Sequence, residues 1–317
     1  MTERAVADRT GRTGPTKAQL RRRGMTRLRR TRRLVQLVIA VLIVVAAVRH
    51  QTSDQAPSVD ALCPFGAVET LVTWLTTGSY LPKIHESNLV LGLAVAAATL
   101  LAGNAFCGWV CPLGAVQDLL AWVARRLHIR QLVVPAKVDR VLRYGRFVVL
   151  GVIVLFSVTT TTLWFATYDP YVTLFGLHWL FEPDWSTLWA GVLVLAVVLA
   201  GSLFVERLWC RYLCPLGGVL SLVGRLGILR IRRSRSACTE CAVCDHSCPV
   251  GIEPSKAQPF VSPDCIGCLD CVAACPVKNA LHVEAPVLLG FPVRRELVGT
   301  AARRTGNDAL RPEREAR

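Results

Sequence analysis

The chain has 317 residues and a formal net charge of +15, and 52% of its residues are hydrophobic. High hydrophobicity together with strong positive charge is typical of a membrane protein with basic cytoplasmic segments. A nucleic-acid-binding protein would need a folded basic surface with base-reading or stacking groups. The sequence contains no such motif, so we expect no nucleic-acid partner.

The first 33 residues are strongly basic, with twelve Lys or Arg residues and two acidic residues. This composition predicts a disordered basic cytoplasmic tail over residues 1–33. Its last arginines, Arg29 to Arg33, stand directly before an apolar stretch, which fits either a twin-arginine export signal or a positive-inside anchor. We favour the anchor, with membrane lipid headgroups as its partner.

Four apolar stretches follow, and a helix needs about 20 residues to cross a bilayer. They predict membrane spans near 34–50, 88–106, 146–166 and 187–207, within a transmembrane domain over residues 34–232. The connections after the second and fourth spans are rich in arginine, whereas residues 167–186 contain no Lys or Arg. The positive-inside rule therefore predicts a multi-pass protein of the cell membrane with both termini in the cytoplasm.

The membrane part contains an internal repeat. Residues 63–76 are similar to residues 169–180, and each half then reaches the pattern C-x3-C-P-L-G, beginning at Cys107 and at Cys210. Each copy holds two predicted spans. The two copies are therefore predicted to be parallel, related by an axis along the membrane normal.

Four cysteines lie in these repeated turns: Cys107, Cys111, Cys210 and Cys214. A proline follows Cys111 and Cys214, so both are predicted near a helix N-cap, where the helix dipole stabilises a thiolate. A symmetric repeat would bring all four thiols together at the inner membrane face. Three roles compete: a further iron-sulfur cluster, a redox-active dithiol or disulfide, and plain buried thiols. The duplication favours a cluster or redox role.

Cys63 and Asp169 occupy equivalent places in the repeat, each before a proline that can start a helix. A structural N-cap is the preferred interpretation for Asp169. Cysteine is a weak cap, and Cys63 also fits a metal ligand, a cofactor attachment point or an intermolecular thiol. We expect the two outer helices to frame an outer-face site where electrons leave or enter.

Residues 233–285 contain C-x2-C-x2-C-x3-C-P twice, with sixteen residues between the two runs. Bacterial two-cluster ferredoxins have this spacing, and in them the fourth cysteine of each run ligates the other cluster. This resemblance implies one 4Fe-4S cluster on Cys238, Cys241, Cys244 and Cys275, and a second on Cys265, Cys268, Cys271 and Cys248. Zinc would not explain the third cysteine of each run, and disulfides would need an oxidising compartment.

The predicted fold class is mainly α. A four-helix transmembrane bundle built from two parallel repeats is followed by a small α+β two-cluster ferredoxin-like domain. Residues 286–317 carry many charges and three prolines. They are predicted to form a disordered cytoplasmic tail.

The two cysteine turns after apolar spans and the double ferredoxin run together resemble a family of membrane-bound 4Fe-4S proteins. This family is typified by the NapH subunit of periplasmic nitrate reductase systems and the membrane half of the regulator NosR. The resemblance covers about residues 34–285. It implies four transmembrane helices, two cytoplasmic 4Fe-4S clusters, and electron transfer between the quinone pool or a cytoplasmic donor and a redox partner across the membrane. We expect a flavin partner, if used, to be a separate protein, because NosR-type proteins carry a flavin-binding domain that this sequence does not show.

We therefore predict an integral membrane electron-transfer protein, similar to a component of a quinol dehydrogenase, without substrate chemistry of its own. The expected partners are membrane lipid, a quinone or cytoplasmic electron donor, and a separate extracytoplasmic redox protein. Assembly factors that reduce copper for cytochrome oxidase share the same motifs. A redox-sensing or metal-reducing maturation factor for a respiratory enzyme is thus the alternative.

Overall fold

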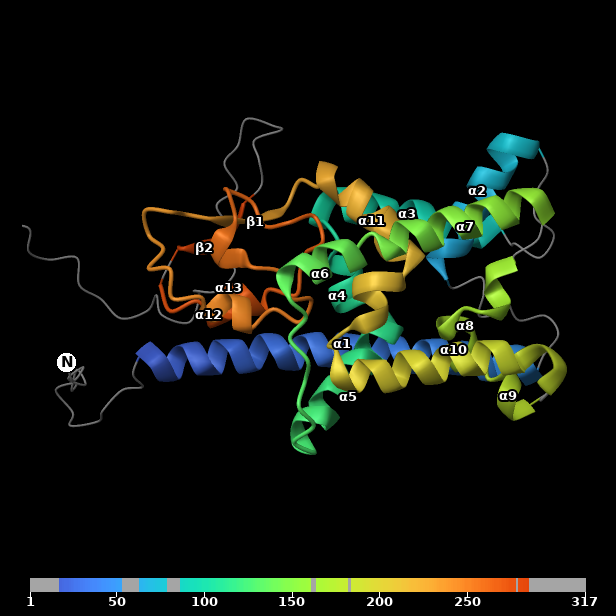
Figure 1. Ribbon diagram of the computed structural model, residues 1–317, viewed down its shortest axis with the longest axis horizontal. Helices are drawn as coiled ribbons and strands as arrows, with labels where there is room; N and C mark the ends of the chain where they lie inside the picture. The colour runs from blue at the N-terminus through green and yellow to red at the C-terminus, as the bar shows by residue number, and fades with distance from the viewer. Residues whose placement is uncertain are drawn as a thin grey trace, which may run out of the picture.

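The computed structural model describes residues 17–52, 63–78, 86–160, 164–181, 184–277 and 279–284. Most of these residues are helical. In Figure 1 the long helices run along the long axis of the molecule, and a small cysteine-rich part lies at one end. The elements of that part are β1 (Arg230–Arg233), α12 (Val243–His246), η5 (Pro254–Lys256), α13 (Asp270–Ala274) and β2 (Leu281–Glu284).

Among the described residues, three helical stretches are long and apolar enough to cross a membrane: Thr26–Thr52, Ala136–Thr160 and Trp185–Phe204. They lie in α1 (Lys17–Thr52), in α6 (Ala136–Leu142) with α7 (Gly145–Thr160), and in α10 (Trp185–Phe204). The expected spans near 34–50, 146–166 and 187–207 fall on these helices. A membrane protein with a mainly helical fold is therefore supported.

The stretch predicted as a span near 88–106 forms α3 (Glu86–Ala102), which has only 17 residues. At 1.5 Å per residue such a helix rises about 25 Å, less than the roughly 30 Å of a bilayer core. The helix ends early because Gly103 adopts a left-handed conformation with φ +62°, which commonly terminates a helix.

The N-terminal tail differs from the prediction. Helix α1 begins at Lys17, so residues 17–33 are helical rather than disordered. Arginine is a good helix former, and Arg29 and Arg32 form ion pairs with Asp270 of α13 at 3.0 and 2.9 Å. These two arginines therefore contact protein, where we expected lipid headgroups. Residues 1–16 and the predicted tail 286–317 lie outside the described residues.

Four helices begin at a proline. They are α2 (Pro64–Thr77), α5 (Pro112–Arg126), α8 (Pro170–Phe175) and α11 (Pro215–Val223), with Cys63, Cys111, Asp169 and Cys214 at their N-caps. The predicted cap positions are thus observed. The shorter elements between them are α4 (Ala105–Trp109), η2 (Trp164–Thr167), α9 (His178–Phe181), the π-helical turn η3 (Trp209–Leu213) and η4 (Gly224–Leu226).

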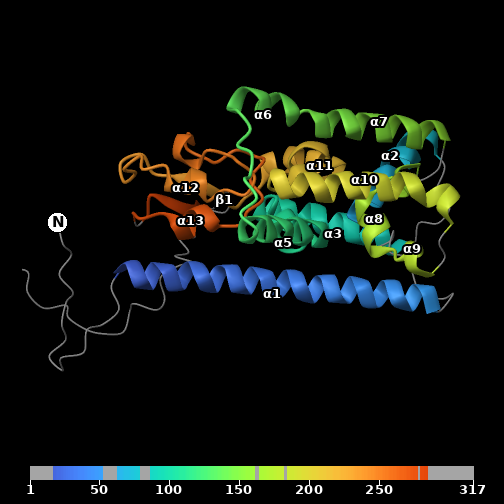
Figure 2. The ribbon, with the colours of Figure 1, turned by 60° about the horizontal axis from the view of Figure 1, so that its bottom comes forward.

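Helices α1 and α6–α7 lie on opposite sides of the bundle, with α3, α5, α10 and α11 between them (Figure 2). The core of the bundle is apolar and includes Phe65, Leu113, Ile153, Phe165 and Trp209. Two polar side chains, Glu69 of α2 and Ser157 of α7, join within it through a hydrogen bond of 2.7 Å.

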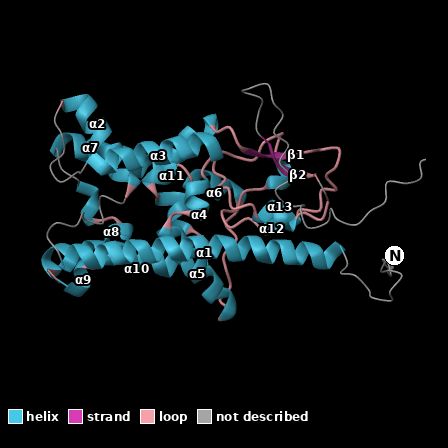
Figure 3. Cartoon of the chain, turned by 180° about the vertical axis from the view of Figure 1, so that it is seen from behind, coloured by secondary structure: helices cyan, strands magenta, loops and turns pink. Residues whose placement is uncertain are grey.

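The cysteine-rich part has little regular structure, as the view from behind shows (Figure 3). Strands β1 and β2 pair antiparallel, from Arg230 opposite Glu284 to Arg233 opposite Leu281. Its two small buried groups combine the cysteines Cys244, Cys268 and Cys271 with the apolar residues Ile231, Val250, Ile266 and Leu281. This part thus combines a small two-stranded sheet with short helices.

Candidate metal centres

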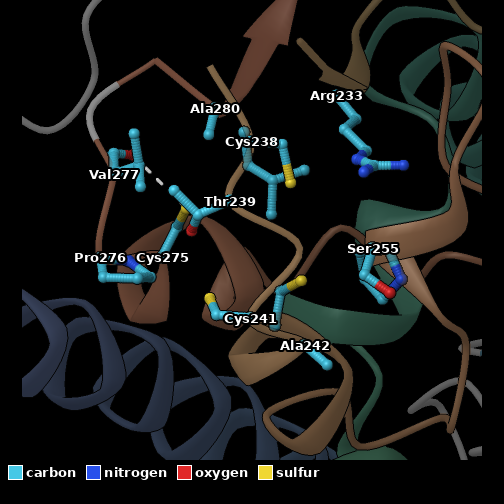
Figure 4. Close-up of a pocket in the computed structure, with 13 residues that line it drawn as sticks. Arg233, Cys238, Thr239, Cys241, Ala242, Ser255, Cys275, Pro276, Val277 and Ala280 are labelled. Atoms are coloured by element: carbon cyan, nitrogen blue, oxygen red, sulfur yellow. Dashed lines mark hydrogen bonds between the residues drawn. The ribbon is translucent and has the colours of Figure 1, made fainter. Parts of the chain in front are cut away.

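Four cysteines line a small cavity in the cysteine-rich part: Cys238, Cys241, Cys244 and Cys275. Three come from the first cysteine run and one from the second. Figure 4 shows Cys238, Cys241 and Cys275 around this cavity, with Arg233 nearby. The set is the one that the ferredoxin resemblance implies for a first cluster.

A second small cavity is lined by the other four cysteines of the double run: Cys248, Cys265, Cys268 and Cys271. Here three come from the second run and Cys248 from the first. Each cavity is thus lined by three cysteines of one run and one cysteine of the other. Cys241 is exposed, whereas Cys268 and Cys271 are buried, so the second cavity is better shielded from water.

The loops of the two runs share a backbone conformation. Glu240 and Gly267 stand before the second cysteine of each run, and Ala242 and Leu269 stand after it; all four have φ between 54 and 61°. Left-handed geometry costs non-glycine residues about 1–3 kcal/mol and persists only where the surroundings impose it. It wraps each loop around its cavity, and the backbone N–H groups of Glu240 and Gly267 donate to Cys238 and Cys265.

Burial raises the pKa of the Cys265 thiol to about 11 and those of Cys244 and Cys268 to about 12. Cys238 differs, because the Glu240 N–H and the Arg233 guanidinium lower the pKa of its thiol. Metals bind the thiolate, so these thiols would hold iron as thiolates after releasing their protons to solvent.

The chemistry of the donor set fits iron-sulfur clusters. Each cavity offers four thiols, and N–H···S bonds are among the contacts that tune such clusters. Within the described ranges, no three His, Cys, Asp or Glu side chains are grouped as a single metal ion requires. The thiols instead stand around a cavity wall, which suits a larger polynuclear group better than one zinc ion.

The cysteines of the helix bundle also come together. Cys107 lies in α4, Cys111 caps α5, Cys210 lies in η3 and Cys214 caps α11. Cys111, Cys210 and Cys214 pack against the same apolar core. We call these four residues the bundle thiols. The Gly217 N–H donates to Cys214 Sγ at 3.4 Å.

The bundle thiols adjoin the second cavity. Cys107 packs against the buried group of Val250, Ile266 and Cys268. The Trp109 indole N–H donates to the Gly267 carbonyl at 3.0 Å. A Cβ added at Gly108 would lie 2.3 Å from the Ile266 carbonyl oxygen, so only glycine permits this close approach.

Three polar residues at this junction were missed by the sequence-based interpretation. Arg207 and Gln117 are fully buried, and Asp118 binds Arg207. Gln117 Nε2 donates to Cys210 Sγ at 3.3 Å. The buried face of α5 carries Leu113, Gln117, Ala121 and Ala124. In the sequence, Gln117 follows Leu113 by four residues, a helical spacing, and this polar residue at a core position was the available signal.

Cys63 and Asp169 lie beside one another, with Cys63 Sγ 3.9 Å from Asp169 Oδ2. Asp169 caps α8 by accepting from the Tyr171 N–H at 2.9 Å. Cys63 packs against the same apolar core as Cys111, Cys210 and Cys214. Cys63 therefore lies against the apolar core of the bundle, and Asp169 beside it is buried.

Aromatic rings connect the two groups. Trp209, next to Cys210, stacks on Phe165 with centroids 6.5 Å apart and planes 4° apart. Phe165 meets Phe65 edge-on at 5.8 Å, and Phe65 is two residues from Cys63. A continuous run of rings thus joins the bundle thiols to the start of α2.

A helical bundle with apolar, membrane-length helices, joined to two four-thiol cavities, defines a membrane-associated iron-sulfur protein. The chain matches the 4Fe-4S binding domain family twice, at residues 84–130 and 187–236, and the 4Fe-4S dicluster domain family at 230–276. The first two matches contain the bundle thiols, and the third contains all eight cysteines of the double run.

Curated relatives agree. The ferredoxin-type protein NapH of Haemophilus influenzae is 35% identical over 64% of this chain and 72% of its own length. The putative electron transport protein YccM of Escherichia coli is 29% identical over 70% of this chain and 62% of its own length. The regulatory protein NosR of Pseudomonas aeruginosa is 33% identical over 57% of this chain and 25% of its own length.

The chain belongs to the membrane-associated ferredoxin-type electron-transfer proteins that include NapH, and it is an iron-sulfur protein. It spans less than two thirds of YccM and a quarter of NosR. No solved structure matches it.

Proposed function

We propose that the protein carries electrons between the quinone pool or a cytoplasmic donor and a redox partner at or across the membrane, without substrate chemistry of its own. Iron-sulfur clusters bound in the two cavities supply single-electron oxidation and reduction. The residues of the chain hold the clusters, exclude water from the second cavity and bring it against the bundle thiols.

The contact between the second cavity and the bundle thiols is the observation that carries this proposal. Cys107 touches the buried group that contains Cys268, and Gly108 removes the side chain that would separate the two backbones. The cavity lined by Cys238 lies farther along the cysteine-rich part. An electron path would therefore run from the Cys238 cavity to the Cys268 cavity and then to the bundle thiols.

Quinol-driven reduction tests the proposal. A quinol analogue added to anaerobic membranes should change the EPR signals of the clusters at rates that support turnover, or a low-potential cytoplasmic donor should do so. Absence of fast exchange with both donor classes would contradict the proposal.

The bundle thiols are proposed as a third redox centre. Both turns that carry these thiols fall within matches to the 4Fe-4S binding domain family, which supports this proposal. About twelve iron atoms per purified chain would support a third cubane, whereas about eight iron atoms would leave a redox dithiol. EPR spectra of Cys107→Ser and Cys214→Ser beside wild type would then show which signals depend on these thiols.

We propose that the cysteine-rich part and both termini face the cytoplasm, with α3 as a fourth, short crossing. The basic start of α1 and Arg125 and Arg126 at the end of α5 support this orientation through the positive-inside rule. A membrane-impermeant protease should cleave near the double cysteine run in inside-out vesicles and spare it in intact spheroplasts. The reverse pattern would invert the orientation.

Cys63 and Asp169 are proposed to mark the far end of the path, because the run of aromatic rings leads to them. Unchanged reduction of the native partner in Cys63→Ala would remove Cys63 from the path.

A redox-sensing or metal-reducing role in maturation is the second candidate. The name of NosR describes a regulatory protein, and that protein shares this region with the chain. Slow, stoichiometric oxidation or reduction with a bound maturation partner, in place of fast quinol turnover, would favour this candidate.

A further inference from the structure

Arg207 is the largest fully buried side chain of the described residues. It lies between α10 and η3, where the backbone takes φ +54°. An arginine in left-handed geometry is uncommon and is retained only when its surroundings hold it there. A buried, always protonated guanidinium is also costly unless it is paired. Both features indicate that the surrounding residues hold Arg207 in this place.

The contacts of Arg207 fix its orientation. Its Nε and Nη2 donate to the two carboxylate oxygens of Asp118, each at 2.7 Å. Its Nη1 donates to the Cys107 carbonyl at 2.8 Å. The guanidinium thus has one edge toward its counter-ion and the other toward the turn that carries the first bundle thiol.

The charge of Arg207 lies at the contact between the bundle thiols and the second cavity. Its guanidinium binds the Cys107 carbonyl, and Cys107 packs against the buried group that contains Cys268. Because Arg207 is fully buried, its charge is poorly screened by solvent. Asp118 is partly exposed and is also 3.5 Å from Arg32. Its negative charge therefore interacts with both Arg32 and Arg207.

We propose that Arg207 is a positioning residue that raises the reduction potential of the cluster held by Cys268, and of the centre held by the bundle thiols, with Asp118 limiting the size of this effect. A nearby positive charge stabilises the reduced form of a centre, which carries one more electron than the oxidised form. The inference rests on the proposed function in one respect, namely that these thiols hold redox centres.

Potentiometric EPR titration of the whole protein in membranes tests the proposal. The signal altered in Cys268→Ser identifies the cluster. Arg207→Met should lower the midpoint potential of that cluster by at least about 59 mV, which corresponds to a tenfold change in the one-electron equilibrium constant. Arg207→Lys keeps the charge and should restore most of the shift. Asp118→Asn keeps the shape of the counter-ion but removes its charge, and should move the potential upward.

Opposite shifts in Arg207→Met and Asp118→Asn separate an electrostatic role from a structural one, because loss of packing alone would not move the potential in two directions. Arg225→Met is the matched control: Arg225 is exposed, and its replacement should leave the potential unchanged. If Arg207→Met does not retain iron, the midpoint potential of Asp118→Asn tests the proposal instead. An upward shift supports the proposal, and an unchanged potential overturns it.

Unchanged potentials at wild-type iron content would overturn the proposal for Arg207 and leave electron transfer untouched. If the potentials shift but the protein oxidises neither a quinol nor a cytoplasmic donor, the role of Arg207 is supported and the proposed function is contradicted.

Discussion

Small residues at the junction determine how closely the two redox groups approach. Gly108 lies against the Ile266 carbonyl, and Gly267, with φ +61°, lies against Ala105. Both glycines are needed because backbone meets backbone there. At the scale of single residues, the close approach of the second cavity to the bundle depends on these two glycines as much as on the cysteines.

Gly108→Ala is expected to separate these two backbones. The added Cβ would lie 2.3 Å from the Ile266 oxygen, a distance that forces a shift and costs about 1–3 kcal/mol. The thermal midpoint should fall, and electron exchange between the cluster of the second cavity and the bundle should slow in stopped-flow reduction.

Gly151→Ala is the matched control, because a Cβ at Gly151 in α7 meets nothing within 4 Å. An alanine in this helix should be neutral or stabilising by up to about 1 kcal/mol. Equal behaviour of the two variants would show that the close approach at Gly108 is not required.

Helix α1 joins the two parts of the molecule. Its arginines reach Asp270, next to Cys271, and Gln36 donates to the Gly108 carbonyl at 3.0 Å. Arg143 and Arg146 bind Asp264 from the opposite side of the bundle. At the scale of elements, the cysteine-rich part is held between α1 and the α6–α7 pair.

Asp270→Asn should loosen this attachment. Arg32 and Asp270 are both buried, and removing one partner of a buried pair typically costs about 3 kcal/mol. Iron should be lost faster from the second cavity to a chelator. The absorbance of the bound clusters measures this loss.

Glu253→Gln in the same part provides the comparison, because the Glu253–Lys256 pair is exposed and such pairs contribute less than about 1 kcal/mol. Iron loss at the wild-type rate in both variants would mean that α1 does not hold the cysteine-rich part.

The cysteine patterns and proline-capped helix starts could be predicted because they are local. The spacing of one run sets its own loop, and a proline marks the first turn of α5 or α11 without help from the rest of the fold. The Arg32–Asp270 contact could not be predicted in this way. Its residues are 238 positions apart, and Arg32 lies in a tail whose composition alone indicates disorder.

The same distinction applies to the candidate site. Arg207 looks in the sequence like one more positive-inside arginine, because its burial depends on how α5 packs against α10 and η3. The length of α3 likewise depends on Gly103, whose left-handed geometry does not follow from hydropathy. Long-range packing and special backbone conformations are thus the parts that sequence patterns do not contain.

At the scale of the whole molecule, the two parts are stabilised differently. The bundle has an extended apolar core, whereas the cysteine-rich part has two four-residue strands and two small buried groups of apolar residues and cysteines. A unit this small usually needs metals or disulfides to fold.

Removal of iron should therefore unfold the cysteine-rich part and spare the bundle. Chelation in detergent is expected to open residues 233–277 to protease while most helical circular dichroism remains. Protection of this segment after complete iron removal would show that its protein contacts suffice. Unfolding of the bundle as well would show that the two parts are not independent in stability.

The burial of the second cavity also constrains the order of biogenesis. Cys268 and Cys271 are enclosed once the α4 turn and α1 are in place, while Cys241 beside the first cavity stays exposed. We therefore expect the second cavity to receive its cluster before the cysteine-rich part packs against the bundle, whereas the first cavity would still exchange its cluster afterwards.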